Sequence, residues 1–460
     1  MNIKPVLIAG GGLAGCEAAW QLGERRVPVT LYEMRPARPT PAHKTDRLAE
    51  LVCSNSLKSN APGSASWLLK EELRRCGSLL LRLADRTAVP GGAALAVDRL
   101  RFAEEITAAV ERHPFIEVRR EEFRQIPGDS LVLIATGPLT SGALASQLEA
   151  VTGSANLAFY DAISPIVDSE TLNLDRIFPA SRYGKGGAED YLNCPLNEQE
   201  YRLFYEALRS ADTVERHAFE DLNYFESCLP IEELARRGYD TLRFGPMKPV
   251  GLIDPRTGRQ PYAVVQLRPE SLRFASYNLV GFQNHLKFPE QKRILRLIPG
   301  LGNVEFLRFG QIHRNTYINA PAVLAPDLSL RPASHVFVAG QLSGVEGYVE
   351  SIATGLLAGL ALAGRRNAQT FVPPPRSTAL GSLVHYITCA DASHYQPANI
   401  SFDLLPALEG LPRSVARDRR ARRDKQCECA LADLGSWIDG WDALAAPPAE
   451  QARTRAVPFL

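Results

Sequence analysis

The chain has 460 residues, of which 45% are hydrophobic and 22% charged, as in an ordinary globular protein with room for two or three domains. No stretch approaches the roughly 20 apolar residues of a membrane span, and the N-terminus, MNIKPVLIAGGG, lacks a signal-peptide pattern. We therefore expect a cytoplasmic protein with no membrane partner. The formal net charge is +1, so a nucleic-acid partner would need a local basic face.

The cysteines indicate a reducing compartment. Eight of them are scattered without the spacing of a disulfide framework, so we expect free thiols. The close pair Cys427 and Cys429 has no second Cys or His pair at zinc spacing nearby, and we predict no metal site. Nothing in the sequence indicates an oligomeric state or a role for this pair.

The first nucleotide-binding signal lies at the N-terminus. Residues 6–9 are a short apolar run typical of a buried parallel strand, residues 14–22 predict a helix, and residues 29–32 predict a second strand ending at Glu33. The glycines between the first strand and the helix form G-x-G-x-x-G, which lets backbone N–H groups approach a pyrophosphate, while the acid can bind a ribose hydroxyl. The predicted cofactor-binding residues here are Gly10, Gly11, Gly12, Leu13, Ala14, Gly15 and Glu33.

Two further strand-to-glycine junctions follow much later in the chain. Residues 131–135 predict an apolar strand ending at a glycine, and residues 336–339 predict a strand that leads through a glycine-rich turn to a helix at 349–363. Three junctions favour one nucleotide-binding fold built from separated segments, as in flavoproteins that bind extended FAD. A simple nicotinamide dehydrogenase does not require the third junction, so FAD is the expected cofactor. The later glycines predicted to bind it are Gly137, Gly340, Gly344 and Gly347.

The intervening segment differs in character. Residues 206–238 read as helical and charged, 261–270 and 277–288 as strands, and 289–300 as a helix ended by Pro-Gly. Residues 372–387 read as a proline-bounded connection before a helical C-terminal region. The predicted fold class is α/β, with a Rossmann-like FAD-binding domain of discontinuous segments and an inserted α+β domain. The predicted boundaries are 1–165 and 326–445 for the FAD-binding domain, 166–325 for the inserted domain, and 446–460 for a tail.

Several blocks of the sequence match one known family. They are VLIAGGGLAGCEAAW, LAELVCSNSL, ALAVDR, FESCLPIEELARRG, GPMKPVGL, HRNTYIN and VAGQLSGVEGYVES. Spread over residues 6–405, they resemble the folate- and FAD-dependent tRNA (uracil-5-)-methyltransferases of the TrmFO family. QLSGVEG departs from the Ile-Thr expected before Gly-Val-Glu-Gly, and the basic tail after Arg413 is particular to this sequence.

The resemblance implies that the T-loop uridine of the tRNA T-arm is methylated to ribothymidine. The methylene of 5,10-methylenetetrahydrofolate would pass through FAD and be reduced with electrons from NADH or NADPH. C5 of uracil is a poor nucleophile until a thiolate adds at C6 and converts the ring to an enolate. The reaction then needs a base to remove the C5 proton and a hydride donor, for which a reduced flavin is suited.

The resemblance assigns the thiol chemistry to Cys53 and Cys228. Cys228 lies just before Pro230 and a helical stretch whose N-terminal amides can lower a thiol pKa, and Cys53 has polar neighbours that include Lys58. The family favours Cys228 as the nucleophile at C6 and Cys53 as a base or alternate nucleophile. For an unassigned cysteine the alternative is burial as a small hydrophobe. Tyr348 is expected beside the flavin, shaping the folate or uracil pocket, with packing of the last helix as its alternative.

Basic residues of the inserted segment are candidates for RNA contact, and solvation of an exposed face is the alternative. They are Lys287, Lys292, Arg293, His313 and Arg314. The late run RSVARDRRARRDKQ, with its arginines at 417–423, is open to both readings. Three other functions stay open: the same chemistry on ribosomal RNA, a flavin oxidoreductase acting on a small molecule, and a non-catalytic RNA-binding flavoprotein.

Overall fold

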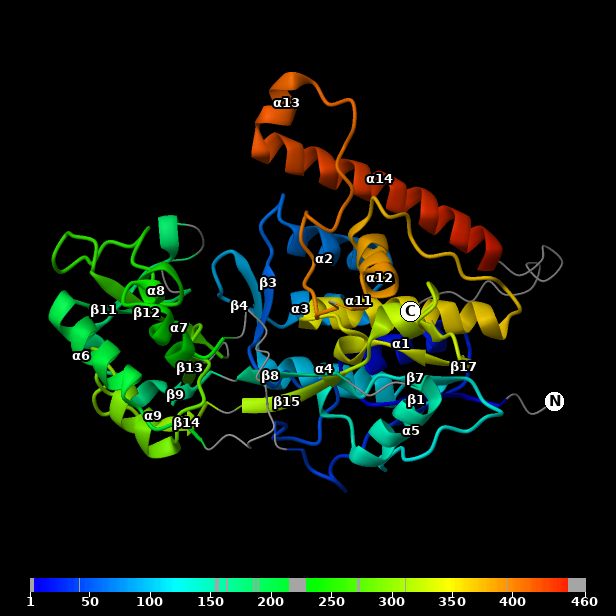
Figure 1. Cartoon of the computed structure of the whole chain (residues 1–460), viewed down its shortest axis with the longest axis horizontal. Helices are drawn as coiled ribbons and strands as arrows, with labels where there is room; N and C mark the ends of the chain where they lie inside the picture. Colours follow the sequence, from blue (N-terminus) through cyan, green and yellow to red (C-terminus); the bar gives the residue numbers. More distant parts are fainter. Residues whose placement is uncertain are drawn as a thin grey trace, which may run out of the picture.

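The structure is a computed structural model (Figure 1), and it describes most of the chain. The described residues are 4–40, 42–153, 157–162, 164–184, 187, 190–214, 229–270, 274–310, 312–393 and 395–445. Within these ranges, no helix is both long and apolar enough to cross a membrane.

A six-stranded sheet forms the centre of the larger part of the molecule. Its order is β16 (Ser329–Leu330), β17 (Ala333–Val338), β7 (Val132–Ile134), β1 (Val6–Ala9), β2 (Val29–Tyr32) and β6 (Ile116–Arg119). All neighbours pair in parallel except β16, which is antiparallel to β17. The strands of the three predicted glycine junctions, β1, β7 and β17, are therefore adjacent. The prediction of one nucleotide-binding fold assembled from separated segments is confirmed.

Two helices that follow glycine turns pack closely against each other (Figure 1). They are α1 (Leu13–Glu24), after β1, and α11 (Tyr348–Arg366), after β17 and the short turn η6 (Gly340–Ser343). A Cβ added at Gly355 would lie 2.3 Å from the carbonyl oxygen of Ala14, so only glycine permits this approach. Other elements of this part include α3 (Leu79–Arg86), α4 (Arg99–Glu111), η1 (Gly137–Leu139), α5 (Gly142–Thr152) and α10 (Ala320–Val323).

A small antiparallel sheet carries the segment around Cys53. Its order is β3 (Ser56–Ser59), β5 (Ala94–Val97) and β4 (Ala88–Val89), and α2 (Ala65–Arg75) follows β3. Buried Lys70 of α2 donates to the carbonyl oxygens of Leu57 at 2.8 Å and Ser59 at 2.7 Å. This small sheet therefore fixes the chain directly after the cysteine.

A second six-stranded sheet, with its own hydrophobic core, lies to the left in Figure 1. Its order is β10 (Phe178–Pro179), β11 (Leu192–Leu196), β12 (Ala263–Pro269), β13 (Ser276–Leu279), β9 (Ile166–Asp168) and β14 (Phe306–Arg308). Its helices are α6 (Glu198–Arg209), α7 (Ile231–Arg237), α8 (Thr241–Phe244) and α9 (Phe288–Leu295). The antiparallel pair β8 (Leu157–Ala162) and β15 (Ile312–Tyr317) runs between the two parts. The strands of this sheet lie within the predicted insertion, whose boundaries stay a prediction.

Two elements differ from the expectation. Only residues 277–279 of the predicted strand 277–288 lie in a strand, β13, because a turn at Gly281, with φ of +75°, ends it. The predicted connection 372–387 contains a helix, α12 (Ala379–Cys389). Thr378 caps this helix by accepting from the Gly381 N–H at 2.9 Å, and the distant Glu72 accepts from two further N–H groups at its start.

The C-terminal region is helical, as expected, with α13 (Arg413–Arg417) and α14 (Arg419–Ala445). The long helix α14 crosses the top of the molecule in Figure 1 and contacts α2. Cys427, Ala430 and Leu434 form its buried stripe, so Cys427 packs as a small hydrophobe. The predicted tail 446–460 lies outside the described residues.

Candidate functional site

In the N-terminal glycine turn, some glycines are required by close packing, whereas Gly12 faces open space. Gly10 has φ of +105°, and a Cβ there would lie 2.5 Å from the Ala135 carbonyl oxygen. A Cβ at Gly15 would lie 1.9 Å from the carbonyl oxygen of Gly10. A Cβ at Gly12 would meet nothing within 4 Å, although Gly12 caps the start of α1. The space beside Gly12 is where a helix N-terminus can receive a phosphate group.

Glu33, at the end of β2, is buried beside this turn. Its Oε2 accepts from the Gly11 N–H at 3.1 Å, and its Oε1 accepts from the Arg35 side chain at 2.9 Å. Burial by itself would raise the pKa of Glu33, but hydrogen bonds and the charge of Arg35 outweigh it and hold the pKa below its usual value. The carboxylate is therefore ionised and oriented, as an acceptor for a ribose hydroxyl must be.

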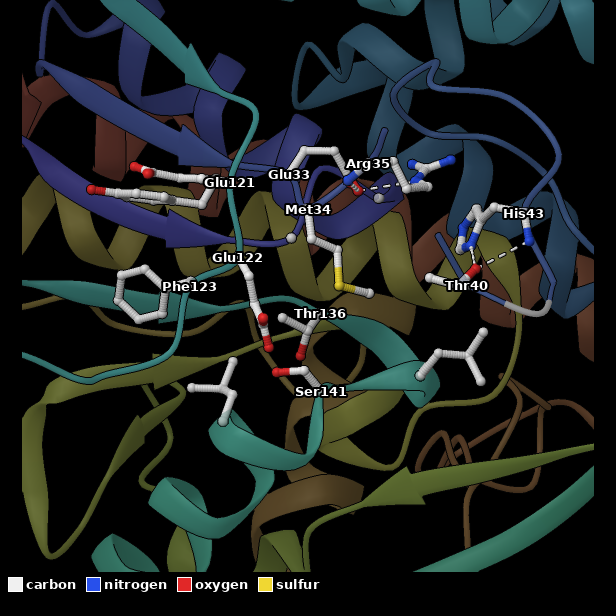
Figure 2. Close-up of a pocket in the computed structure, with 15 residues that line it drawn as sticks. Glu33, Met34, Arg35, Thr40, His43, Glu121, Glu122, Phe123, Thr136 and Ser141 are labelled. Carbon is white, nitrogen blue, oxygen red and sulfur yellow. Dashed lines mark hydrogen bonds and ion pairs between the residues drawn. The ribbon is translucent and has the colours of Figure 1, made fainter. Parts of the chain in front are cut away.

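A pocket opens between the glycine turn and β7 (Figure 2). Glu33, Met34, Thr136 and Ser141 lie around it, together with Glu122 from the chain after β6. Gly10 and Gly12 also line it, while Gly137, whose Cβ would be unobstructed, begins the turn η1 beside it. The sequence did not single out Thr136 or Glu122, because neither stands in a motif of its own.

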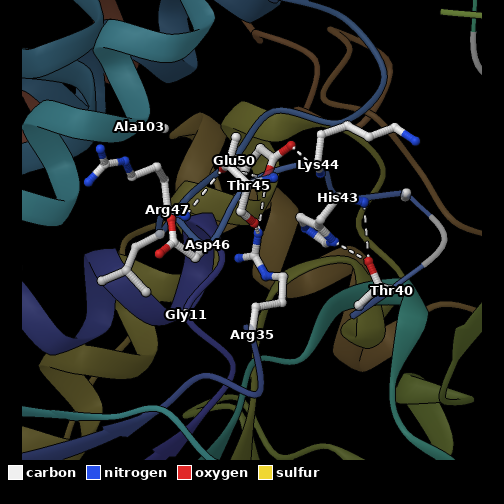
Figure 3. Close-up of polar contacts among 12 residues, drawn as sticks. Gly11, Arg35, Thr40, His43, Lys44, Thr45, Asp46, Arg47, Glu50 and Ala103 are labelled. Carbon is white, nitrogen blue, oxygen red and sulfur yellow. Dashed lines mark hydrogen bonds and ion pairs between the residues drawn. The ribbon is translucent and has the colours of Figure 1, made fainter. Parts of the chain in front are cut away.

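The chain after β2 is tied to this pocket by ionic contacts (Figure 3). The Arg35 guanidinium donates to the Thr45 carbonyl oxygen and to the Glu50 carboxylate, both at 3.0 Å. Glu50 in turn accepts from the N–H groups of Lys44 at 2.8 Å and Thr45 at 3.0 Å. Glu50 lies in the block LAELVCSNSL that contains Cys53, so the network links Glu33 to the cysteine segment.

Cys53 and Tyr348, predicted from blocks far apart in the sequence, lie together. The Tyr348 hydroxyl accepts from the Cys53 N–H at 2.7 Å and from the Ser54 N–H at 3.1 Å. Tyr348 begins α11, while Cys53 precedes β3 and is half-buried. Burial raises the pKa of Tyr348 far above its usual value, so the phenol is neutral. The tyrosine thus positions the cysteine segment, whatever else it contacts.

Two arginines hold the same segment from other elements. Arg99, at the start of α4, donates to the Leu51 carbonyl oxygen at 2.7 Å and pairs with Glu270 at 2.8 Å. Arg268, in β12 of the second sheet, donates to the Ser54 hydroxyl at 2.6 Å and the Asn55 side chain at 2.9 Å. The sequence indicates no role for either arginine, since their partners lie far away in the chain.

The later glycines have packing reasons of their own. A Cβ at Gly340 would lie 3.0 Å from that of Ala14, and one at Gly344 would lie 2.2 Å from the Tyr395 hydroxyl. At Gly347, with φ of +118°, a Cβ would lie 2.3 Å from Glu350. These three glycines are explained by close approach within the chain, and their contact with FAD stays a prediction.

The structure describes the side chains of only some of the predicted RNA-binding residues. Lys287, Lys292 and Arg293 are exposed at α9, where Lys287 lies 3.6 Å from Asp212 and Arg293 pairs with Glu290 at 2.7 Å. His313 and Arg314 lie in β15 at positions whose side chains are not described, and Cys228 lies outside the described residues. In the part that is described, no group of three or more His, Cys, Asp or Glu side chains is arranged to hold a metal ion.

Comparisons with known proteins found one matching family model and several similar proteins. A family model described as "Glucose inhibited division protein A" matches residues 5–370. Methylenetetrahydrofolate–tRNA-(uracil-5-)-methyltransferase TrmFO of Solibacter usitatus is 61% identical over 94% of this chain and 98% of its own length. The protein of the same name from Koribacter versatilis is 58% identical over 95% and 98%. The crystal structure of Aquifex aeolicus GidA (form II) is similar in fold, with a TM-score of 0.69 over 97% of this chain and 74% of that one, at 17% identity.

Proposed function

The chain belongs to the TrmFO family, and we propose that it methylates C5 of a uridine in tRNA, with 5,10-methylenetetrahydrofolate as the carbon donor. The observation that carries the proposal is the Tyr348 hydroxyl accepting from the N–H groups of Cys53 and Ser54. This contact joins the two sequence blocks most typical of the family. It gives the cysteine segment a fixed position beside the start of α11.

The residues present fit FAD as the resident cofactor. Open space beside Gly12 at the start of α1 suits a pyrophosphate, and the ionised Glu33 suits a ribose. When bound, FAD supplies the hydride chemistry that turns a methylene into a methyl group, and NADH or NADPH is the proposed source of electrons. The remaining proposed cofactor contacts are the turn residues around these two and Gly137, Gly340, Gly344 and Gly347.

The two thiols, of Cys228 and Cys53, have different roles in the reaction of the uracil ring. The Cys228 thiolate adds to C6, which places electron density on C5 for attack on the one-carbon unit. Cys53 takes the proton from C5 as the one-carbon unit separates from its carrier. Once a hydride has reduced that unit to a methyl group, the Cys228 thiolate leaves C6 and the C5–C6 double bond is restored. This division rests on the resemblance to the family, and the roles of the two thiols could be exchanged.

The proposed partner is the T-arm of tRNA in the cytoplasm. The printed names of the most similar relatives refer to tRNA, which favours tRNA over a ribosomal RNA substrate. The same relationship to named methyltransferases disfavours a small-molecule flavin oxidoreductase and a non-catalytic RNA-binding flavoprotein. Lys287, Lys292, Arg293, His313 and Arg314 are the proposed contacts with the RNA backbone.

The test is methyl transfer from labelled 5,10-methylenetetrahydrofolate to a T-arm transcript, with NAD(P)H and FAD-loaded protein. Cys228→Ala and Cys53→Ala should each retain FAD and lose at least about 100-fold in rate, the scale of a lost nucleophile or base. Cys389→Ala is the matched control, because Cys389 is exposed on α12 and has no proposed role. A ribosomal RNA fragment and a transcript with cytidine at the target site complete the set. Near-normal turnover in both cysteine variants would eliminate the mechanism.

A further inference from the structure

Three phenylalanine rings of the second part form a stack that ends at the surface. The ring of Phe306, in β14, lies 5.1 Å from that of Phe309, which in turn lies 4.9 Å from Phe288 at the start of α9. The ring planes of the two pairs are inclined by only 21° and 20°, so the rings are stacked rather than edge-on. Phe306 packs against the core of this part, whereas Phe288 is 47% exposed. The last ring of the stack therefore faces solvent.

A lysine lies beside this stack without an acidic partner. Lys292 follows Phe288 by one turn of α9, and its Nζ lies 5.8 Å from the centre of the Phe309 ring. Among the ion pairs of the described residues, none involves Lys292. The carboxylate of the same helix, Glu290, is bound by Arg293 at 2.7 Å. The start of α9 thus presents an exposed ring together with a cation that no described acid neutralises.

This combination matches the chemistry of an unpaired nucleotide. Bases in RNA loops are unstacked from one another, and aromatic side chains bind them by stacking while basic side chains contact the phosphates. A protein partner would instead require a broad apolar patch. The exposed residues that follow Phe288 and Pro289 in α9 are charged, Lys292 and Arg293, so the ring stands at the edge of a basic surface. The charge of this surface favours a polyanion as its occupant.

We propose that the ring of Phe288 stacks on an unpaired base of the bound RNA. The inference rests on the proposed function and deepens it, because it adds recognition of a base to the phosphate contacts proposed for α9. Phe288 lies in the second part of the molecule and the Cys53 segment lies in the first (Figure 1), so the stacked base is a loop base other than the target uridine.

The experiment measures the Kd of FAD-loaded protein for a T-arm transcript at several salt concentrations. Phe288→Leu should raise the Kd about tenfold, the scale of one lost base–aromatic stack. The log–log salt slope should stay unchanged, because stacking releases no counterion. Phe288→Tyr keeps a ring and should bind normally. Phe244→Leu is the matched control, since Phe244 is 82% exposed in the same part and stacks on no described ring, and it should leave the Kd unchanged.

A set of transcripts, each with one abasic nucleotide in the loop, identifies the stacked base. One abasic site should weaken binding to the unmodified protein but not weaken binding to Phe288→Leu any further, because the contact is already lost. Absence of such a coupled site would overturn the proposal.

FAD absorbance and melting temperature establish that each variant is folded. An unchanged Kd in folded Phe288→Leu, or an equal loss in Phe244→Leu, would also overturn the proposal. A changed oligomeric state of Phe288→Leu with unchanged RNA affinity would overturn it in favour of contact with a second copy of the chain. Phe288-dependent RNA binding without any methyl transfer would instead contradict the proposed function alone.

Discussion

At the scale of single residues, substitutions in the glycine turn can separate an effect on folding from an effect on cofactor binding. Gly12→Ala should leave the chain folded, because the new Cβ meets nothing within 4 Å and the backbone φ is −79°. It should weaken FAD binding at least about tenfold, since the methyl group enters the space proposed for the pyrophosphate. A tenfold loss corresponds to about 1.4 kcal/mol of binding free energy. FAD titration of the apoprotein measures this loss.

Gly15→Ala is the contrasting variant in that experiment. Its Cβ would lie 1.9 Å from the Gly10 carbonyl oxygen, so the turn itself must shift. We expect a loss of about 1–3 kcal/mol in the free energy of unfolding, as for an overpacked core, in addition to weaker FAD binding. Unchanged FAD affinity in Gly12→Ala would show that the open space beside Gly12 does not hold the cofactor.

The residues around Cys53 show what the sequence could and could not reveal. Cys53 and Tyr348 stand in distinctive blocks of the sequence, and the structure brings them into contact, while their roles in one site stay a prediction. Arg99 and Arg268 were not predicted, because a charged residue in an amphipathic pattern is usually solvated. Only the packing of the second sheet against the cysteine segment gives Arg268 its partners.

At the scale of helices and strands, the local sequence pattern predicted an element where that element did not depend on distant residues. The bounds of β1 and β2 coincide with the apolar runs 6–9 and 29–32. The helix α12 was missed because its first N–H groups are satisfied by Glu72, a residue about 300 positions earlier that the local sequence does not reveal. The proline-rich residues therefore predicted a connection, but not the helix that follows them.

The packing of α11 on α1 leads to a prediction for the free energy of unfolding. Gly355→Ala should destabilise the protein by about 1–3 kcal/mol, because its Cβ would lie 2.3 Å from the backbone of Ala14. It should also disturb FAD binding, since α1 carries the glycine turn. Urea unfolding, followed by circular dichroism and flavin absorbance, measures both effects.

The control for this helix variant is Gly435→Ala in α14. No heavy atom lies within 4 Å of a Cβ built at Gly435. Alanine is the better helix former by about 1 kcal/mol, so this variant should be as stable as the unmodified protein or slightly more stable. Equal stability of Gly355→Ala and the unmodified protein would mean that α11 can move away from α1 without cost.

At the scale of the whole molecule, the positive charge that would bind RNA must be concentrated on one face, because the net charge is only +1. The basic face predicted at α9 is partly neutralised by its own surroundings, with Arg293 bound to Glu290 by two hydrogen bonds of 2.9 and 2.7 Å. Lys292 instead lies over the ring of Phe309, with Nζ 5.8 Å from its centre. Lys292 is therefore expected to contribute more to RNA binding than Arg293 does.

The salt dependence of RNA binding tests this distribution. Each phosphate contact that is lost should reduce the log–log slope by roughly 0.7 to 0.9. Lys292→Gln should reduce it by about that amount, Arg293→Gln by less, and the double variant should bind more weakly while its flavin is reduced by NAD(P)H at the normal rate. Substituting the arginines at 417–423 should have a milder effect. Lys4→Gln is the control, because Lys4 lies just before β1, which is far from α9 in Figure 1. If neither basic set changes the slope, both are solvated faces and the RNA contacts must lie elsewhere, nearer to the Cys53 segment and its arginines.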